Sequence, residues 1–219
     1  MEKIPPAYYA TNLGALSFGE MMRIGGFFNG LLGFALGRFM PPQGREPMPP
    51  DYDVMEAQRS DIAPHILGRI CQKGDVLLPL GFREVGYQRL PHKADKSGSI
   101  IYLSNCGQMV AHISVLKKDE PANDYGVAPS VCAFDTQANT ITVSNSGLSV
   151  NPLPGSKLII KKGKRLNQLV PILKKEMEIS RREYARFAGW QDLREWQGTI
   201  ETRTFLHRRD VRKLFVPVD

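Results

Sequence analysis

The sequence predicts an α+β protein built on an antiparallel sheet of about six strands. Runs rich in Val, Ile, Thr and Tyr fill the middle of the 219-residue chain, and helical periodicity precedes and follows them. The breaks between the runs are short, which favours hairpins over the crossovers of about a dozen residues that parallel strands need. We therefore expect a helix before the sheet, a longer helix after it, and an N-terminal helical extension rich in Gly and Phe.

Six strand-like runs separated by turn residues make up the expected sheet. They cover residues 82–90, 99–105, 108–117, 130–136, 140–145 and 157–162. The segments Asn105-Cys106-Gly107 and Gln137-Ala138-Asn139 each fit a hairpin turn. Helices are expected within residues 60–79, 165–188 and 190–197, followed by an irregular segment or a late edge strand.

Composition divides the chain into four segments. Residues 1–40 are an arm that carries the Gly/Phe helix, and residues 41–58 hold five prolines. Because proline fixes φ and removes a backbone donor, we expect 41–58 to be a stiff linker and the best domain boundary. Residues 59–200 then form the α+β domain, and residues 201–219 form a basic C-terminal tail.

The positive charge of the chain is concentrated in its last third. Residues 1–155 hold 13 Lys/Arg and 14 Asp/Glu, whereas residues 156–219 hold 16 Lys/Arg and 8 Asp/Glu. Such asymmetry suggests an acidic partner, such as anionic lipid, nucleic acid or an acidic protein face. It is equally typical of a solvated helix face rich in Arg.

The segment between Arg23 and Arg38 is the most unusual feature of the sequence. Its 14 residues, IGGFFNGLLGFALG, carry no charge and one polar side chain, Asn29. As a helix the segment would be about 21 Å long, too short for a bilayer core of about 30 Å. Its five glycines would cost roughly 4–5 kcal/mol of helix propensity in water. We therefore expect it to pack tightly against something.

Glycines in this segment follow a four-three-four spacing that would place them in one stripe along a helix. Small residues at such spacing let helix backbones approach closely, as in membrane helix pairs. Three structures fit the pattern: a membrane-associated helix, a helix packed on its own domain or a sister subunit, and a glycine-rich loop. The residues predicted to make helix-packing or membrane contacts are Gly26, Gly30, Gly33, Gly37, Phe27, Phe28, Leu31 and Phe34.

No catalytic motif is present, and we predict neither an enzyme nor a cofactor. The sequence lacks GxGxxG, Walker A, GxSxG and HExxH patterns, and its four histidines lie at no metal-ligand spacing. His112 in a strand and Cys106 in a turn are the only catalytic candidates, and a structural role for the histidine is the preferred interpretation. Three widely spaced cysteines and no visible signal peptide indicate a reducing, cytoplasmic compartment.

Two basic clusters accompany the helix expected over residues 165–188, and we predict that they contact an anionic partner. Helix N-termini already favour anions. Aromatic residues interleave with the later arginines, as in some proteins that bind single-stranded nucleic acid. A helix that covers a sheet explains that pattern better, so nucleic acid is disfavoured. The predicted contact residues are Lys161, Lys162, Lys164, Arg165, Arg181 and Arg182.

Residues 78–188 carry a series of short motifs. They are Leu80-Gly81-Phe82, FDTQANTITVSN over 134–145, Leu153-Pro154 and the helix from Arg165. In these motifs the chain resembles a group of uncharacterised bacterial proteins. The resemblance implies a compact α+β domain, often joined to membrane-related segments, and it brings no activity and no functional residues.

These observations favour a non-catalytic binding or scaffolding protein. We expect an accessory subunit docked through the Gly/Phe helix to a membrane, to a membrane protein complex or to a sister subunit, with anionic lipid as a further contact. Its expected location is the cytoplasm, at the periphery of the inner membrane. The alternative is a soluble small-molecule-binding domain whose sheet cups the ligand and whose N-terminal helix is a lid or dimer element.

Overall fold

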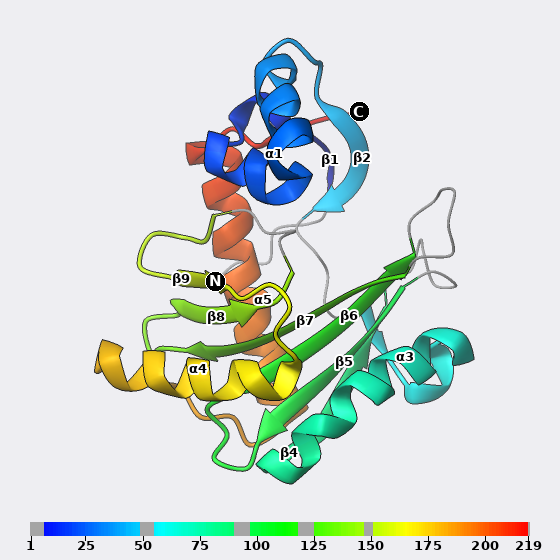
Figure 1. The fold of residues 1–219 in the computed structure, drawn as a ribbon, viewed down its shortest axis with the longest axis vertical. Helices are drawn as coiled ribbons and strands as arrows, with labels where there is room; N and C mark the ends of the chain where they lie inside the picture. The colour runs from blue at the N-terminus through cyan, green and yellow to red at the C-terminus, as the bar shows by residue number, and fades with distance from the viewer. Residues whose placement is uncertain (1–6, 49–54, 90–96, 118–124, 147–150, 219) are drawn as a thin grey trace. The chain divides into compact units, whose positions relative to one another are not determined.

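The computed structural model describes residues 7–48, 55–89, 97–117, 125–146 and 151–218. They form a mixed α+β protein of two compact units (Figure 1). The large unit consists of Tyr52–Ser146 and Gly155–Trp196. The small unit consists of Met1–Asp51, Gly147–Pro154 and Gln197–Asp219. It is therefore built from segments near both ends of the chain.

A seven-stranded sheet lies at the centre of the large unit, counted over the described residues. In spatial order it contains β3 (Glu56–Ala57), β4 (Phe82–Gln88), β5 (Ser97–Ser104), β6 (Val110–Lys117), β7 (Tyr125–Phe134), β8 (Thr140–Ser144) and β9 (Lys157–Ile160). All neighbours are antiparallel except β8 and β9, which are parallel. The six predicted runs correspond to β4 to β9, so the α+β class and these strands are confirmed, but the prediction missed the two-residue β3 and the parallel pairing of β9. The 12 residues between β8 and β9 are long enough for a parallel connection.

Both predicted hairpin turns are confirmed. Residues 105–107 lie in the connection 105–109 between β5 and β6, and Gly107 adopts a positive φ of 75°. Residues 137–139 lie in the connection 135–139 between β7 and β8, where the Asp135 carboxylate accepts hydrogen bonds from the backbone N–H groups of Gln137 (3.0 Å) and Asn139 (2.8 Å). Local side-chain bonding of this kind replaces the ladder bonds that the turn gives up.

Helices cover both faces of this sheet (Figure 1). One face packs against α3 (Pro64–Gly74) and α4 (Leu166–Ser180), whose Ile66, Ile70 and Leu173 are fully buried. On the other face, the Trp190 ring at the start of α5 (Trp190–Leu206) lies where a Cβ at Gly86 would come within 2.7 Å. The large unit thus has a closed core on the face that α3 and α4 cover.

The C-terminal helices differ from the prediction in their bounds. The helix expected over 165–188 ends at Ser180, because Arg181 turns into the left-handed region with φ 52°. Tyr184 then forms an isolated antiparallel bridge with Asp135. The short helix expected over 190–197 continues instead to Leu206, and a π-helical turn, His207–Val211, follows it.

A three-stranded antiparallel sheet joins the chain ends in the small unit. Its order is β10 (Phe215–Pro217), β1 (Ala7–Thr11) and β2 (Gln43–Met48). Residues 41–58, expected to be a linker, thus contain a paired strand, and the tail expected over 201–219 contains helix and strand. Tyr9 and Phe205 meet edge to face with ring centroids 5.1 Å apart, which packs the end of α5 against β1.

Helix α1 (Phe18–Gly37) is the Gly/Phe helix of the small unit. It begins with a capping box, in which the Ser17 side chain and the Glu20 carboxylate each accept a backbone N–H of the other residue. A short 3₁₀ turn, Leu13–Ala15, precedes it. The buried side chains of Leu16, Met21 and Leu214 make a small hydrophobic cluster beneath it.

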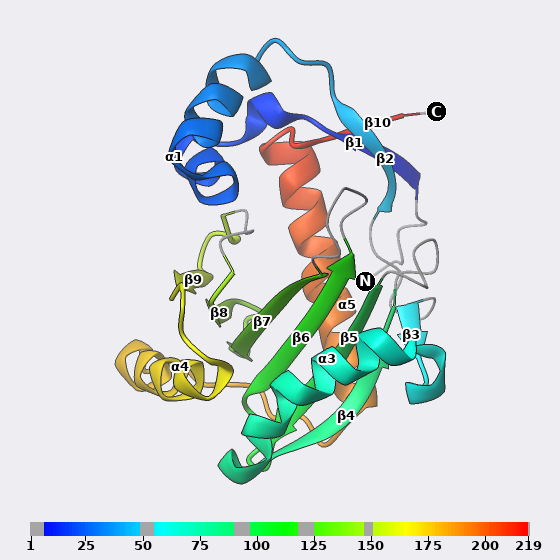
Figure 2. The same ribbon diagram turned by 45° about the vertical axis from the view of Figure 1, so that its right-hand side comes forward.

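Helix α1 is bent so strongly that its two ends meet (Figure 2). The rings of Phe18 and Phe34 lie 5.3 Å apart between centroids. A Cβ at Gly33 would lie 2.6 Å from the Met21 Cε. In a straight helix, residues 18 and 34 would be about 24 Å apart. Both contacts are centred on residues 26–27, so the bend falls in the glycine-rich middle, where glycine pairs lower the cost of kinking.

Candidate functional site

A buried ion pair anchors the start of α1 to the C-terminal segment within the small unit. The fully buried Glu20 carboxylate accepts two hydrogen bonds from the Arg212 guanidinium, at 2.8 and 2.6 Å. It also accepts the backbone N–H groups of Asn151 (2.6 Å) and Ser17 (2.8 Å). A bidentate pair of this geometry is among the strongest polar contacts in proteins.

Hydrogen bonding decides the ionisation of Glu20. Burial alone raises the pKa of its carboxyl. Hydrogen bonds from the Arg212 guanidinium and from the N–H groups of Asn151 and Ser17 outweigh burial and bring the pKa down to about 2. Glu20 is therefore charged at neutral pH and neutralises Arg212. Because the two charges are paired with each other, neither is available to bind a charged ligand.

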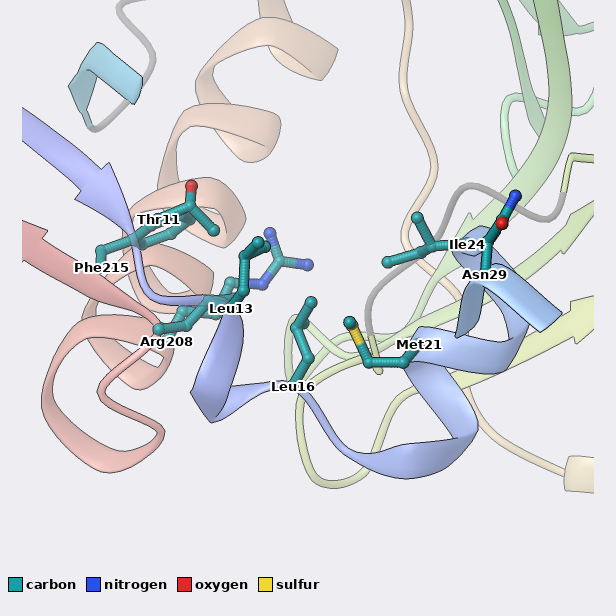
Figure 3. A pocket seen from close by; sticks show the side chains of 9 residues that line it. Thr11, Leu13, Leu16, Met21, Ile24, Asn29, Arg208 and Phe215 are labelled. Carbon is teal, nitrogen blue, oxygen red and sulfur yellow. The ribbon is translucent and has the colours of Figure 1, made fainter. Parts of the chain in front are cut away.

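A pocket of about 400 Å³ lies in the same unit, with Met21, Ile24 and Asn29 of α1 in its wall (Figure 3). Its wall is almost entirely apolar and comes from β1, the 3₁₀ turn, α1 and the C-terminal segment. The lining residues are Thr11, Leu13, Leu16, Met21, Ile24, Asn29, Arg208, Leu214 and Phe215. Its volume lies within the range of about 300–1,000 Å³ typical of small-molecule sites.

One cationic side chain, Arg208, enters this apolar wall. Figure 3 shows it extending past Leu13 toward the side of the pocket that Leu16 and Ile24 line. Its Nε is buried and has no hydrogen-bond partner among the described residues. Burial lowers the pKa of Arg208, and the nearby Arg212 lowers it further, while Glu201 and Glu20 oppose this. Leaving a guanidinium N–H unpaired away from water is unfavourable.

The opposite, outer side of α1 exposes large apolar side chains. Leu32 and Leu36, one helical turn apart, are 59% and 50% exposed, and Phe39, which follows the end of the helix, is 87% exposed. Such clusters on a protein surface mark interaction sites more often than isolated apolar residues do. We call the set the outer face of α1: Leu31, Leu32, Leu36, Phe39 and Met40.

Gly33 and Gly37, the described part of the glycine stripe, face the protein rather than the outside. A Cβ at Gly37 would lie 3.4 Å from the Leu13 Cβ and 3.6 Å from its backbone, so the close approach is made within the small unit. Gly33 meets Met21 and Phe34 meets Phe18, whereas Leu31 is exposed. The remaining predicted contacts belong to the part of α1 whose side chains lie outside the described residues: Gly26, Phe27, Phe28 and Gly30.

The predicted anion-contact residues lie at opposite ends of α4. Four are exposed around its start: Lys161, Lys162, Lys164 and Arg165. Arg181 caps its C-terminus. Arg182 bonds to the buried Asp135 carboxylate (3.0 Å) and to the Gly155 carbonyl (2.7 Å), which holds the β7–β8 turn. A helix of 15 residues is about 22 Å long, so the structure does not bring the two clusters together.

The two catalytic candidates of the sequence lie on separate parts of the large unit. His112 is half-buried in β6, with its Nδ1 3.2 Å from the Ser114 Oγ, and burial lowers the pKa of its ring to about 4. Cys106 is exposed in the β5–β6 turn. Burial raises the pKa of its thiol, but hydrogen bonds from Ser104 and the turn backbone, with Lys174 nearby, lower it overall. Among the described residues, no group of His, Cys, Asp and Glu could hold a metal ion.

Sequence reasoning missed the pocket and the cation within it. Arg208 lies among Arg209, Arg212 and Lys213, and that run is indistinguishable from a solvated basic tail in the sequence. The one available signal was the apolar pair Leu214-Phe215 directly after the charged run, which indicates burial of the segment.

Comparisons with known proteins assign the chain to no family. No family model, no curated protein and no solved structure matches it. The resemblance of residues 78–188 to uncharacterised bacterial proteins therefore stays a prediction. The described part of the chain contains no helix with the length and apolar character needed to cross a bilayer.

Proposed function

We propose that the protein is a non-catalytic binding protein that attaches to an anionic membrane surface through the outer face of α1. The observation that carries the proposal is the exposure of Leu32 and Leu36 on a helix whose other side is packed, and of Phe39 just after that helix. Attachment would bring the small unit to the membrane as an accessory module. The large unit would then be available to a membrane protein complex.

Apolar insertion supplies the first part of the binding free energy. Each of the three protruding side chains would gain about 1–2 kcal/mol on leaving water. Phe39 directly follows the C-terminal turn of α1, so it can enter the interface without unfolding the helix. Interfacial helices bury their apolar side about 5–10 Å into the headgroup boundary, which does not require a spanning length.

Charge favours a lipid surface over an apolar groove of another protein. Residues 21–45 contain three arginines and no Asp or Glu, so this stretch carries a net charge of +3. Arg38 is exposed beside the outer face of α1, with its guanidinium 4.6 Å from the centroid of the Phe34 ring. Each basic residue near an anionic surface adds about 1 kcal/mol of attraction, and stable peripheral binding needs such a second signal beside apolar insertion.

Vesicle flotation tests the proposal. The full-length protein should float with vesicles of phosphatidylcholine and phosphatidylserine, float less with phosphatidylcholine alone, and be released by high salt. Leu36→Asp and Phe39→Asp should each reduce the bound fraction at least tenfold, since charge at an inserted position is strongly unfavourable.

Ile179→Asp is the matched control. Ile179 is 62% exposed on α4 in the large unit, so its substitution makes the same chemical change outside the outer face of α1 and should leave flotation unchanged. Absence of flotation for the wild-type chain would exclude the proposal. Self-association that Leu36→Asp abolishes, without lipid binding, would instead identify a second copy of the chain as the occupant.

The alternative of a ligand cupped by the large sheet receives less support. Leu166, Leu169 and Leu173 of α4 are buried against one face of that sheet and seal it. The pocket of about 400 Å³ that the described residues line lies inside the small unit, with α1 as part of its wall. A small-molecule role therefore belongs to that pocket.

A further inference from the structure

We propose that the pocket lined in part by α1 binds a carboxylate that carries an aliphatic chain, such as a medium-chain fatty acid, with the carboxylate on Arg208 and the chain on the apolar wall. This site is separate from the outer face of α1. It does not depend on membrane attachment.

The chemistry of the wall selects an aliphatic ligand. Leu16, Met21 and Ile24 provide branched or flexible aliphatic surface, and Leu214 and Phe215 close the side formed by the C-terminal segment. Apolar side chains of this kind bind by surface burial and make no directional demands. The pocket volume of about 400 Å³ suits one chain of moderate length and excludes a two-chain phospholipid.

The single cation selects the head group. Arg208 is the one charged residue of the wall, and its Nε lacks a hydrogen-bond partner among the described residues. Its neighbour Arg212 is already paired with Glu20. A carboxylate would accept two parallel N–H groups from the Arg208 guanidinium, the geometry that this side chain matches best.

Neither nearby carboxylate supplies the hydrogen-bond partner that the Arg208 Nε lacks among the described residues. Glu201 and Glu20 both attract Arg208, while Arg212 repels it. Glu20 is saturated by Arg212, Asn151 and Ser17. A carboxylate would accept charge-assisted hydrogen bonds from the Arg208 guanidinium, whereas the hydroxyl oxygen of an alcohol of the same length would accept only a weaker one.

Calorimetric titration of the full-length protein with decanoate, below its micellar concentration, tests the proposal. We expect saturable binding at one site, and binding of decanol at least tenfold weaker because it lacks the charge-assisted hydrogen bonds. Arg208→Gln should weaken decanoate binding about tenfold or more and leave decanol binding unchanged.

Two variants separate the head-group contact from the apolar wall. Arg209→Gln is the matched control: Arg209 is adjacent in sequence, pairs with Asp210 at 2.6 Å and does not line the pocket. It should bind decanoate as the wild type does. Ile24→Trp fills the pocket from its rim and should weaken decanoate and decanol alike.

A readout on the wild-type protein guards against a variant that fails to fold. The carboxyl carbon of ¹³C-labelled decanoate should titrate at lower pH when bound than when free, because a neighbouring guanidinium favours the carboxylate. Absence of saturable binding, equal affinity for decanoate and decanol, or an unshifted titration would each overturn the proposal. The outer-face variant Phe39→Asp should retain decanoate binding, so failure of the membrane proposal leaves this one standing.

Discussion

At the scale of single residues, Gly107 joins a positive φ to a close backbone approach. Its φ is 75°, and a Cβ there would lie 2.6 Å from the Phe187 carbonyl oxygen. Gly163 has the same φ of 75° but nothing within 4 Å of the corresponding position. Alanine at Gly163 would therefore meet backbone strain alone, whereas alanine at Gly107 would meet the same strain and a steric clash as well.

Gly107→Ala should lower the free energy of unfolding of the large unit by about 2–4 kcal/mol, the sum of left-handed strain and an overpacked contact. Gly163→Ala should cost only about 1 kcal/mol. Urea unfolding followed by tryptophan fluorescence measures both, because Trp190 and Trp196 belong to the large unit. Equal losses for the two variants would show that the turn shifts away from Phe187 at little cost.

Glu20 makes the stability of the small unit depend on pH. Its folded pKa of about 2 lies below the ordinary value of 4.5, so its contribution is complete above about pH 4.5 and is lost as the pH falls toward 2. The expected contribution is about 3 kcal/mol. The protection factor of the Asn12 amide, which donates to the Leu214 carbonyl at 2.8 Å, should therefore fall between pH 5 and pH 3, after the intrinsic exchange rate at each pH is divided out.

Glu20→Gln should remove most of that pH dependence and destabilise the small unit at neutral pH, since it leaves Arg212 without a charged partner. Asp210→Asn is the control. Asp210 is an exposed small-unit carboxylate that hydrogen bonds from Arg209 hold at a lowered pKa, and exposed pairs contribute little. An unchanged pH profile in Glu20→Gln would assign the dependence to another group.

At the scale of elements, local patterns predicted what local interactions determine. The alternating runs of β5 to β8 and both hairpin turns were readable because their pairing partners are neighbours in sequence. The sheet of β10, β1 and β2 was not, since Thr11 pairs with Phe215 near the other end of the chain, and β1 and β2 are separated by the whole of α1. Helix α4 ends at Ser180 although apolar periodicity continues to Phe187, because Tyr184 pairs with Asp135 instead.

The bend of α1 was also not predicted from the sequence pattern. Glycine spacing was interpreted as a stripe on a straight helix, whereas the bend brings Phe18 onto Phe34, and α1 forms part of the pocket wall. Arg208 acquires its role only through that bend, because most of the pocket wall comes from segments far from it in sequence. The candidate site is formed by tertiary contacts between distant segments, so no local sequence pattern could predict it.

Distance measurement between spin labels tests the bend. Labels at Gly19 and Ala35, both exposed, would be about 24 Å apart along a straight helix. A clearly shorter separation is expected in a background in which Cys71, Cys106 and Cys132 are replaced. Alanine at both Gly25 and Gly26 should lengthen the separation, because it removes the glycine pair from the bend. A wild-type separation near 24 Å would rule the bend out and, with it, the pocket.

At the scale of the whole molecule, the division into two units predicts the effect of truncation. Deletion of residues 1–40 removes β1 and α1 but no element of the large unit. Tryptophan fluorescence should therefore keep its native unfolding transition. Amides over residues 205–217 should lose protection from hydrogen exchange, because β10 loses its only neighbour in the sheet of the described residues. Loss of the tryptophan transition would show that the units fold as one.

The pairing of β1 with β10 has a consequence for how the protein is made. Thr11 lies opposite Phe215 in this sheet, so at ribosomal rates of about 5–20 residues per second the first strand waits roughly 10–40 s for its partner to be synthesised. During that interval the large unit is synthesised up to Trp196, while the apolar stretch of α1 has neither Arg212 nor Leu214 to hold it. The apolar segment of α1 is therefore synthesised early and packed late, so we expect chaperones to bind the nascent chain during translation.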